Sequence, residues 1–390
     1  MLAACLMTAL IMPVRAAEQK QTACDCGNVV QVFLRGFGRM NAKPDFSADH
    51  TEFPEYEFHY DFRSGPYKPA RQLNDFIEEL CRITNHEKIS LMGSSQGSNI
   101  VMTYVKEYGI DRLETLTLVN GASMGATLMG EIFTNRFALS GPATINYFSA
   151  RKDNHSDSPR RAAFWAWLRT TPLQNFYMPL NIGSETGGWF YRQWMSLVVG
   201  WMPILLTFLP EDDYREARRV LEGHAQYAKK YAGLLAECDK YFDEVQTKTT
   251  QLLLDAKEAG VRVAVIASYG KAPIPLIRNT SYQCDSIIDT SYESLGATTA
   301  PIGETLPPGG DGRYRSPDGV IDASTCALPD QTWFIKGSSH TYKTSHDLRQ
   351  WIIHCKAYPS IHENPLYPQY LYLTKDGKTI PLPGENANLF

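Results

Sequence analysis

The apolar residues of this 390-residue chain follow two kinds of spacing. Short, nearly continuous apolar runs are typical of strands buried on both faces of a parallel sheet. Apolar residues spaced three or four apart are typical of helices that cover such a sheet. Strands are predicted at residues 28–34, 56–63, 88–93, 113–120, 261–268 and 332–336, and helices at residues 70–83 and 98–108. The alternation of the two predicts an α/β fold with a doubly wound, mostly parallel sheet.

This alternation stops between Gly121 and Ala259, where no strand pattern is found. The segment is rich in aromatic residues and holds five of the seven tryptophans, namely Trp165, Trp167, Trp189, Trp194 and Trp201. We interpret residues 124–259 as a helical cap inserted over the carboxyl edge of the sheet, where open α/β folds bind ligands. The core would then comprise residues 18–123 and 260–390. The same aromatic run could be ordinary buried helix or a lid that touches lipid transiently, but Arg192, Gln193 and Pro203 argue against a membrane span.

The first 17 residues resemble a secretory signal peptide. An apolar stretch from Leu2 to Val14 is followed by Val14-Arg15-Ala16, with small residues where a signal peptidase cleaves. No Lys or Arg precedes the apolar stretch, and about 13 apolar residues are too few to cross a bilayer. We expect a secreted or otherwise extracytoplasmic protein that begins near Ala17.

The net charge and the cysteine content limit the partners, metals and disulfides that are expected for this chain. The formal net charge is -4, and no dense basic face is present, so nucleic acid is not an expected partner. The chain has 8 cysteines. The Cys24-x-Cys26 spacing fits neither a zinc site nor a redox pair, so no metal is expected. In an oxidising compartment disulfides are expected instead, with Cys284 and Cys326 a plausible pair.

The sequence Gly93-Ser94-Ser95-Gln96-Gly97 stands between a predicted strand and a predicted helix. Glycines two positions either side of a serine allow a sharp turn that exposes the serine hydroxyl. The alternative is a simple strand-to-helix connection. A second glycine-containing turn, Arg35-Gly36-Phe37-Gly38, follows the first strand. It matches neither G-x-G-x-x-G nor G-K-[ST], so dinucleotide binding is not favoured.

A histidine and three carboxylates complete the candidate chemistry. His340 is the one of nine histidines that stands in a loop directly after a predicted strand, where a general base could reach the serine. Asp285, Asp289 and Asp318 all follow the predicted strand at residues 261–268. We prefer Asp285, because it starts a turn soon after that strand. The common alternative for each Asp is a turn cap.

These motifs, with Tyr60-Asp-Phe-Arg63 and Phe334-x-x-Gly-x-x-His340, resemble the α/β-hydrolase superfamily, in particular lipases akin to lecithin:cholesterol acyltransferase. The resemblance covers residues 28–123 and 260–356 and leaves the cap unmatched. This chain departs from the usual lipase pattern in two turns. It has Arg35 where lipases show His, and Asp285-Ser-Ile where they show Asp-Gly-Thr.

The resemblance implies a serine hydrolase that cleaves carboxylic esters of lipids or of medium-to-long acyl chains without a cofactor. Ser95 would be the nucleophile, His340 the base and Asp285 the acid. The backbone amides of Gln96 and of Phe37 or Gly38 would form the oxyanion hole. Two alternatives remain, an acyltransferase with an alcohol acceptor and an inactive hydrolase fold that only binds ligands.

Overall fold

The structure, a computed structural model, describes residues 29–37, 46, 55–136, 138–149, 159–179, 202–222, 229–340, 346–354, 361–362, 364–374 and 377–383. An eight-stranded sheet forms its centre, in the order β12-β11-β10-β7-β4-β3-β1-β2. Its neighbouring strands are parallel except β11 and β12. The strands are β1 (Gln31–Leu34), β2 (Glu55–Glu57), β3 (Ile89–Ser95), β4 (Leu113–Gly121), β7 (Arg262–Tyr269), β10 (Thr332–Lys336), β11 (Tyr370–Leu373) and β12 (Thr379–Pro381).

The order of the strands reverses direction next to β1. From β1 the chain adds β2 at one edge, returns to place β3 on the other side of β1, and then adds the remaining strands outward in sequence order. Ligands in such sheets bind at the carboxyl ends of the strands where the order reverses. The carboxyl ends of β1 and β3 carry the two glycine-containing turns noted above. The predicted doubly wound α/β-hydrolase fold is confirmed.

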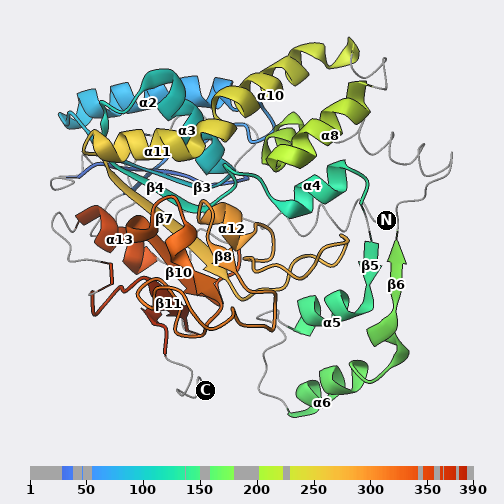
Figure 1. Ribbon diagram of the computed structural model, residues 1–390. Coiled ribbons are helices and arrows are strands. Elements are labelled where there is room, and N and C mark those ends of the chain that lie inside the picture. Colours follow the sequence, from blue (N-terminus) through green and yellow to red (C-terminus); the bar gives the residue numbers. More distant parts are fainter. Residues whose placement is uncertain are drawn as a thin grey trace.

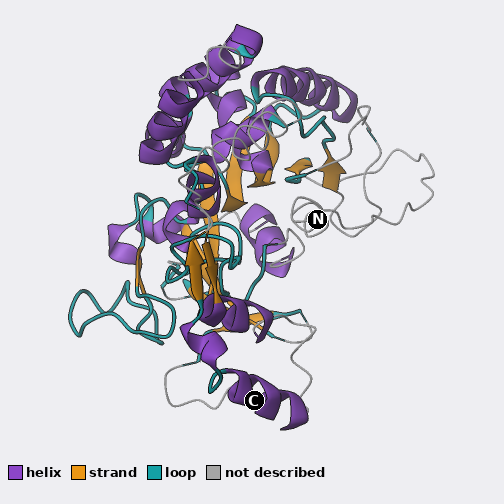
Figure 2. Ribbon diagram, turned by 90° about the vertical axis from the view of Figure 1, so that its right-hand side faces the viewer, coloured by secondary structure: helices purple, strands orange, loops and turns teal. Residues whose placement is uncertain are grey.

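Helices cover both faces of the sheet (Figure 1). On one face lie α2 (Tyr67–Thr84), α3 (Gln96–Tyr108), α10 (Ala232–Glu244) and α11 (Thr249–Glu258); the other is covered by α13 (His346–His354). Figure 2 shows the strands between these helical layers. Along β7, Val263 and Val265 pack toward the first layer, whereas Ala264 and Ile266 pack toward the second. Because both faces are buried, successive residues are apolar, which explains the continuous runs in the sequence.

The helix α2 shows how the sequence sets these layers. Its buried residues Leu73, Phe76, Ile77 and Leu80 recur at intervals of three and four and lie on the core side. The helix ends at Asn85, whose φ of 55° is left-handed and whose amide donates to the Cys81 carbonyl oxygen.

A long insertion joins β4 to β7, and within the described residues it adds no strand to the central sheet. Figure 1 shows part of it, from β5 to β6, set apart from the sheet at the right of the view. The expectation that this segment has no strands is wrong, because β5 and β6 form a small antiparallel pair. Three-residue strands are too short to give a sequence pattern. The insertion comprises α4 (Thr127–Phe133), β5 (Ala138–Ser140), α5 (Gly141–Ser149), α6 (Pro159–Leu168), η2 (Pro172–Asn175), β6 (Tyr177–Pro179), η3 (Pro203–Phe208), α8 (Glu211–Glu222), α10, η4 (Gln246–Lys248) and α11.

The tryptophans of the predicted cap fall largely outside the described residues. Trp189, Trp194 and Trp201 lie there, and so does the side chain of Trp165. Trp167 is 59% exposed. None of the helices in the described ranges is both long and apolar enough to span a bilayer. The cap at residues 124–259 remains a prediction.

The segment between β7 and β10 is mostly loop. It contains α12 (Thr290–Glu293), β8 (Thr298–Thr299), β9 (Ile321–Asp322), η5 (Ala323–Thr325) and η6 (Pro329–Gln331). The sequence pattern predicts no strand after residues 332–336, and this is wrong because β11 and β12 follow. The β11 sequence Tyr-Leu-Tyr-Leu is a four-residue edge-side run, too short to be distinguished from loop by periodicity alone.

The predicted disulfide between Cys284 and Cys326 is also wrong. Both thiols are buried and free. Cys284 Sγ lies 3.2 Å from the Lys271 carbonyl oxygen and accepts from the Ser286 amide at 3.3 Å, so a local turn holds it. Sequence separation carries no information on where two cysteines point. Residues 1–17, Cys24, Cys26 and Cys355 lie outside the described residues.

Candidate active site

Ser95 stands at the sharp turn between β3 and α3, with a φ of 54° in the left-handed region. A non-glycine residue is strained there. A Cβ on Gly93 would lie 2.8 Å from the Gly97 backbone, and one on Gly97 would lie 2.4 Å from the Leu34 carbonyl oxygen. Both positions therefore need glycine, as the sequence motif predicts.

The turn is tied to the neighbouring strand β4. The Ser98 hydroxyl donates to the Ser95 carbonyl oxygen at 2.6 Å and accepts from the Ala122 amide at 2.9 Å. This contact was not predicted, because a serine in the first turn of a helix has many uses that look alike in sequence. It holds the strained turn in place.

His340 follows β10 and reaches across to Ser95. Its Nε2 lies 2.8 Å from the Ser95 Oγ, and its Nδ1 contacts the Asp285 Oδ2. The His340 backbone amide donates to the Asp285 carbonyl oxygen at 2.9 Å. With the proton on Nδ1 donated to the carboxylate, Nε2 is free to accept the serine proton.

Asp285 is fully buried. Its Oδ1 accepts from the amides of Ile287 and Ile288, each at 2.9 Å, while Oδ2 faces the imidazole. Burial favours a higher pKa for this carboxyl, but the neighbouring His340 and the hydrogen bonds together lower its pKa below the usual value. An ionised, oriented carboxylate thus stands behind the histidine.

The two other candidate acids are bound elsewhere. Asp289 accepts from the Thr127 amide at 2.8 Å and from its hydroxyl at 2.6 Å, at the start of α4. Asp318 pairs with Lys336 at 2.8 Å and accepts from the Tyr269 hydroxyl at 3.0 Å. Of the three, Asp285 is the one that contacts His340.

The turn after β1 passes close to the serine. A Cβ on Gly36 would lie 2.9 Å from the Ser95 Oγ, so only glycine leaves room for a reacting group. The Tyr60 hydroxyl lies 2.6 and 2.7 Å from the carbonyl oxygens of Arg35 and Gly36. It fixes both carbonyls toward itself and thereby orients the turn. Tyr60 belongs to the Tyr60-Asp-Phe-Arg63 motif, but this contact was not predicted.

The structure describes two of the three predicted oxyanion-hole residues, Phe37 and Gln96. Phe37 continues the turn after Gly36, whereas Gly38 lies outside the described residues. Gln96 begins α3, and the first amides of a helix have no acceptor within it. The Gln96 side chain donates to the Phe62 carbonyl oxygen at 2.7 Å, which anchors this residue beside the serine.

An apolar cluster brings the insertion next to these turns. Phe37 packs edge-on against Phe208 of η3, with ring centroids 6.4 Å apart. Ile204 and Ile288 belong to the same cluster, which thus joins the turn after β1, the Asp285 loop and the insertion. The surroundings of Ser95 are therefore apolar on this side.

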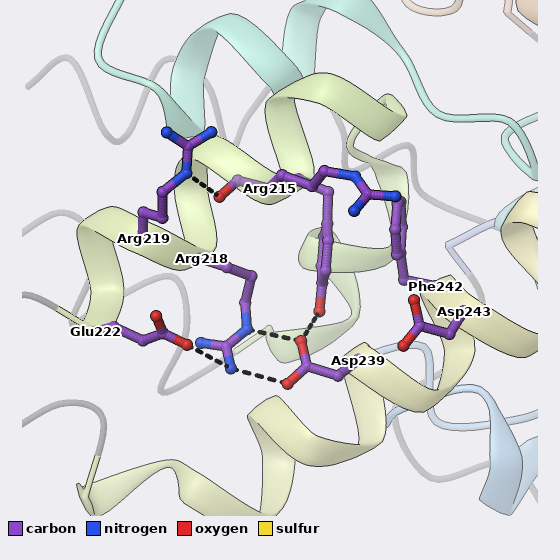
Figure 3. A pocket seen from close by; sticks show the side chains of 8 residues that line it. Arg215, Arg218, Arg219, Glu222, Asp239, Phe242 and Asp243 are labelled. Atoms are coloured by element: carbon purple, nitrogen blue, oxygen red, sulfur yellow. Dashed lines mark hydrogen bonds and ion pairs between the residues drawn. The ribbon is translucent and has the colours of Figure 1, made fainter.

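A separate pocket of about 410 Å³ lies between α8 and α10 and shares no residue with the Ser95 site (Figure 3). Its main cation, Arg218, is bound to Asp239 at 2.7 Å and to Glu222 at 3.4 Å. Arg215 pairs with Glu211 at 2.8 Å. Both guanidinium groups are thus paired with carboxylates of α8 or α10.

Sequence comparison finds no matching family model and no similar curated protein. Comparison of structures does find chains with distant similarity. A lipase from Bacillus licheniformis, BlEst2 in mature form, is 12% identical over 50% of this chain and 82% of its own, with a TM-score of 0.24. The N-acyl homoserine lactonase AidH, complexed with N-butanoyl homoserine, is 11% identical over 86% of this chain and 92% of its own, with a TM-score of 0.31.

A third neighbour is 2-hydroxy-6-oxo-6-phenylhexa-2,4-dienoate hydrolase from Rhodococcus sp. strain RHA1. It is 11% identical over 45% of this chain and 66% of its own, with a TM-score of 0.20. Because all three scores are far below 0.5, the class rests on the strand order and on the turn at Ser95. By these, the chain has the α/β-hydrolase fold with a Ser-His-Asp arrangement at its carboxyl edge.

Proposed function

We propose that this protein is a serine hydrolase that cleaves carboxylic esters through an acyl-enzyme on Ser95. The observation that carries the proposal is the chain of contacts from Ser95 Oγ to His340 Nε2 and from His340 Nδ1 to Asp285, with the serine on a strained turn. A serine hydroxyl is a weak nucleophile until a base removes its proton. The proposal gives this task to His340, which contacts both Ser95 and the buried Asp285.

The reaction follows from this geometry. Ser95 Oγ attacks the ester carbonyl while His340 Nε2 takes its proton, and the imidazolium then protonates the leaving alcohol. A water molecule then attacks the acyl-enzyme in the same way, with His340 as the base, which releases the acid and restores Ser95. The amides of Gln96 and of Phe37 or Gly38 stabilise the oxyanion, at roughly 3 kcal/mol for each donor.

The substrate class that we propose is an ester with a medium or long acyl chain. The apolar cluster of Phe37, Phe208 and Ile288 lies beside the catalytic turns, which favours an apolar acyl group over a charged one. Each CH₂ that the site removes from water contributes about 0.8 kcal/mol. Rates on p-nitrophenyl esters from acetate to decanoate test this, with kcat/KM expected to rise at least to octanoate. A maximum at acetate or butyrate would contradict it.

A fluorophosphonate probe tests the mechanism itself. It should label the protein at Ser95 and fail to label Ser95→Ala. No labelling of the native protein would favour the binding-only alternative. Adding an alcohol acceptor separates hydrolysis from acyl transfer, because a transferase diverts product from free acid to ester.

We also propose that the protein is exported and processed near Ala17. The support is the apolar stretch Leu2 to Val14 and the small residues after it. Intact mass of secreted material, with and without reductant, tests both the cleavage and any disulfide among the remaining cysteines.

A further inference from the structure

A second buried carboxyl, Glu293, lies behind the Asp285 side chain. Glu293 ends the short helix α12 and is 2% exposed. Its Oε2 accepts from the Ser268 amide at 2.6 Å, at the carboxyl end of β7. One carboxylate oxygen each from Asp285 and Glu293 and a ring nitrogen of His340 all lie within 4.8 Å of one another. Two buried carboxyls and one partly buried imidazole are thus packed together.

The charges of this group do not balance if both acids are ionised. Asp285 has His340 and two backbone amides as partners. Glu293 has one backbone amide, and its Oε1 has no N–H or O–H donor among the described residues. Within the same residues no Lys or Arg pairs with Glu293. Two like charges so close in a buried site cannot both persist, and one acid keeps a proton.

We propose that Glu293 is a neutral carboxylic acid that donates a hydrogen bond to the Asp285 carboxylate and so positions it for His340. Glu293 is then a positioning residue, since it acts on the histidine only through Asp285. Its Oε2 accepts from Ser268 and its hydroxyl donates to Asp285, which satisfies both ends of the side chain. The inference rests on the proposed function, in which Asp285 orients the base.

The environment of Glu293 agrees with a retained proton. Burial, followed by the charge of Asp285, raises the pKa of Glu293 well above its usual value, and its hydrogen bond helps to lower the pKa of Asp285. The titratable groups that face it are Asp285, Asp289, Cys284 and His340. Neutrality matters for His340, because a second negative charge here would hold the imidazolium too tightly for it to release a proton.

A metal ion is the competing way to neutralise this cluster. Both ring nitrogens of His340 already face other groups, Ser95 and Asp285, and Asp285 Oδ1 takes two backbone amides. A cation would have to displace these contacts, whereas a proton fits between the two carboxyls as they stand.

The substitution Glu293→Gln mimics the neutral acid, since its amide can accept from Ser268 and donate to Asp285. The measurement is the titration of the His340 ring by NMR, in a Ser95→Ala background, so that it does not depend on turnover. We expect Glu293→Gln to leave the pKa of His340 unchanged. If Glu293 is ionised, removing its charge lowers that pKa by about one unit or more, which would overturn the proposal.

Measurements of ester hydrolysis distinguish a positioning role of Glu293 from a role in packing alone. In the native background, Glu293→Gln should keep kcat within about twofold, while Glu293→Ala should lower kcat by about tenfold or more with KM little changed. Equal losses in the two variants would contradict the proposal. If Glu293→Ala does not fold, the Gln variant and the titration decide alone.

Two controls complete the experiment. Glu131 is another buried glutamate that accepts backbone amides, those of Arg278 and Asn279, but it has no contact with the triad among the described residues; Glu131→Gln should leave the His340 titration unchanged. Loss of native activity on EDTA treatment would support a metal in the cluster and overturn the proposal. Failure of the fluorophosphonate to label Ser95 would refute the proposed function, while the ring titration would still report on Glu293.

Discussion

The carboxyl edge of the sheet and the pocket between α8 and α10 are both rich in charged residues, yet they differ in how those charges are used. At the sheet edge, Asp285, Glu293 and His340 are packed against one another, and His340 also contacts Ser95. In the α8–α10 pocket, Arg218 and Asp239 are 17% and 39% exposed in their side chains and neutralise each other. The first arrangement sets the Ser95 hydroxyl against the His340 imidazole; the second pairs its arginines with carboxylates.

This difference in how the charges are arranged shows that a surface pocket alone does not identify a functional site. The α8–α10 pocket has a volume of about 410 Å³, but its charged residues join two helices of the insertion. Functional sites are instead marked by buried titratable groups held in strained or constrained backbone. The following experiments test this contrast, from the largest expected effect to the smallest.

Replacing Ser95 should have the largest effect. Ser95→Ala removes the nucleophile, and we expect kcat to fall by about 10⁶-fold, with His340→Ala giving a loss of similar size and the double variant little more. Ester hydrolysis under single-turnover conditions measures this. Unchanged far-UV circular dichroism and melting temperature serve as the control, since the change removes one hydroxyl. Retained activity would refute the assignment of Ser95.

Replacing Asp285, the proposed triad acid, should have the second-largest effect on activity. Asp285→Asn removes the charge that orients His340 and should lower kcat by about 10⁴-fold. Asp318→Asn is the matched control, because Asp318 pairs with Lys336 away from the histidine, and it should keep activity within about twofold. The reverse order of effects would mean that the contact of Asp285 with His340 is not the working one.

A smaller effect concerns stability and Asp289. Burial, which outweighs the hydrogen bonds from Thr127, raises the pKa of Asp289 from 3.8 to about 6. The folded protein therefore binds this proton more tightly than the unfolded chain does. Its contribution is fully present below pH 4 and is lost as the pH rises to about 6, by about 3 kcal/mol in all.

The comparison for Asp289 is with Asp289→Asn, which cannot ionise. Denaturant unfolding of both proteins between pH 4 and 7 should show the native protein losing free energy of unfolding relative to the variant as the pH rises, with a constant difference above about pH 6. Parallel curves would show that the folded and unfolded pKa values are alike.

The sequence predicted most of the sheet and the sharp turn at Ser95, because both depend on local rules. Buried parallel strands need continuous apolar runs, and the turn at Ser95 needs glycine at positions 93 and 97. Both requirements concern only a few neighbouring residues. The Asp285 choice was less determined, since three acids followed the same strand and only the folded loop shows which one meets His340.

What the sequence could not predict depends on contacts between distant residues. Glu293 is an ordinary glutamate in the sequence, and only its burial against Asp285 and Ser268 marks it. The same holds for Tyr60, whose hydroxyl meets a turn 24 and 25 positions earlier. The free thiols of Cys284 and Cys326 are a further example. An expectation of disulfides based on the compartment contains no information on where the side chains point.

The smallest effect is expected in the α8–α10 pocket. Arg218 joins α8 to Asp239 of α10, and Asp239 also accepts from the Tyr214 hydroxyl at 2.5 Å. Because both partners of the ion pair are partly exposed, the solvent screens their attraction, and Arg218→Met should lower the free energy of unfolding by about 1 kcal/mol or less. A double-mutant cycle with Asp239→Asn isolates the pair itself. Ester hydrolysis by Arg218→Met should match the native rate, since this pocket shares no residue with the Ser95 site. A loss of activity well beyond the loss of stability would show that the pocket takes part in substrate binding, and the contrast between the two regions would then fail.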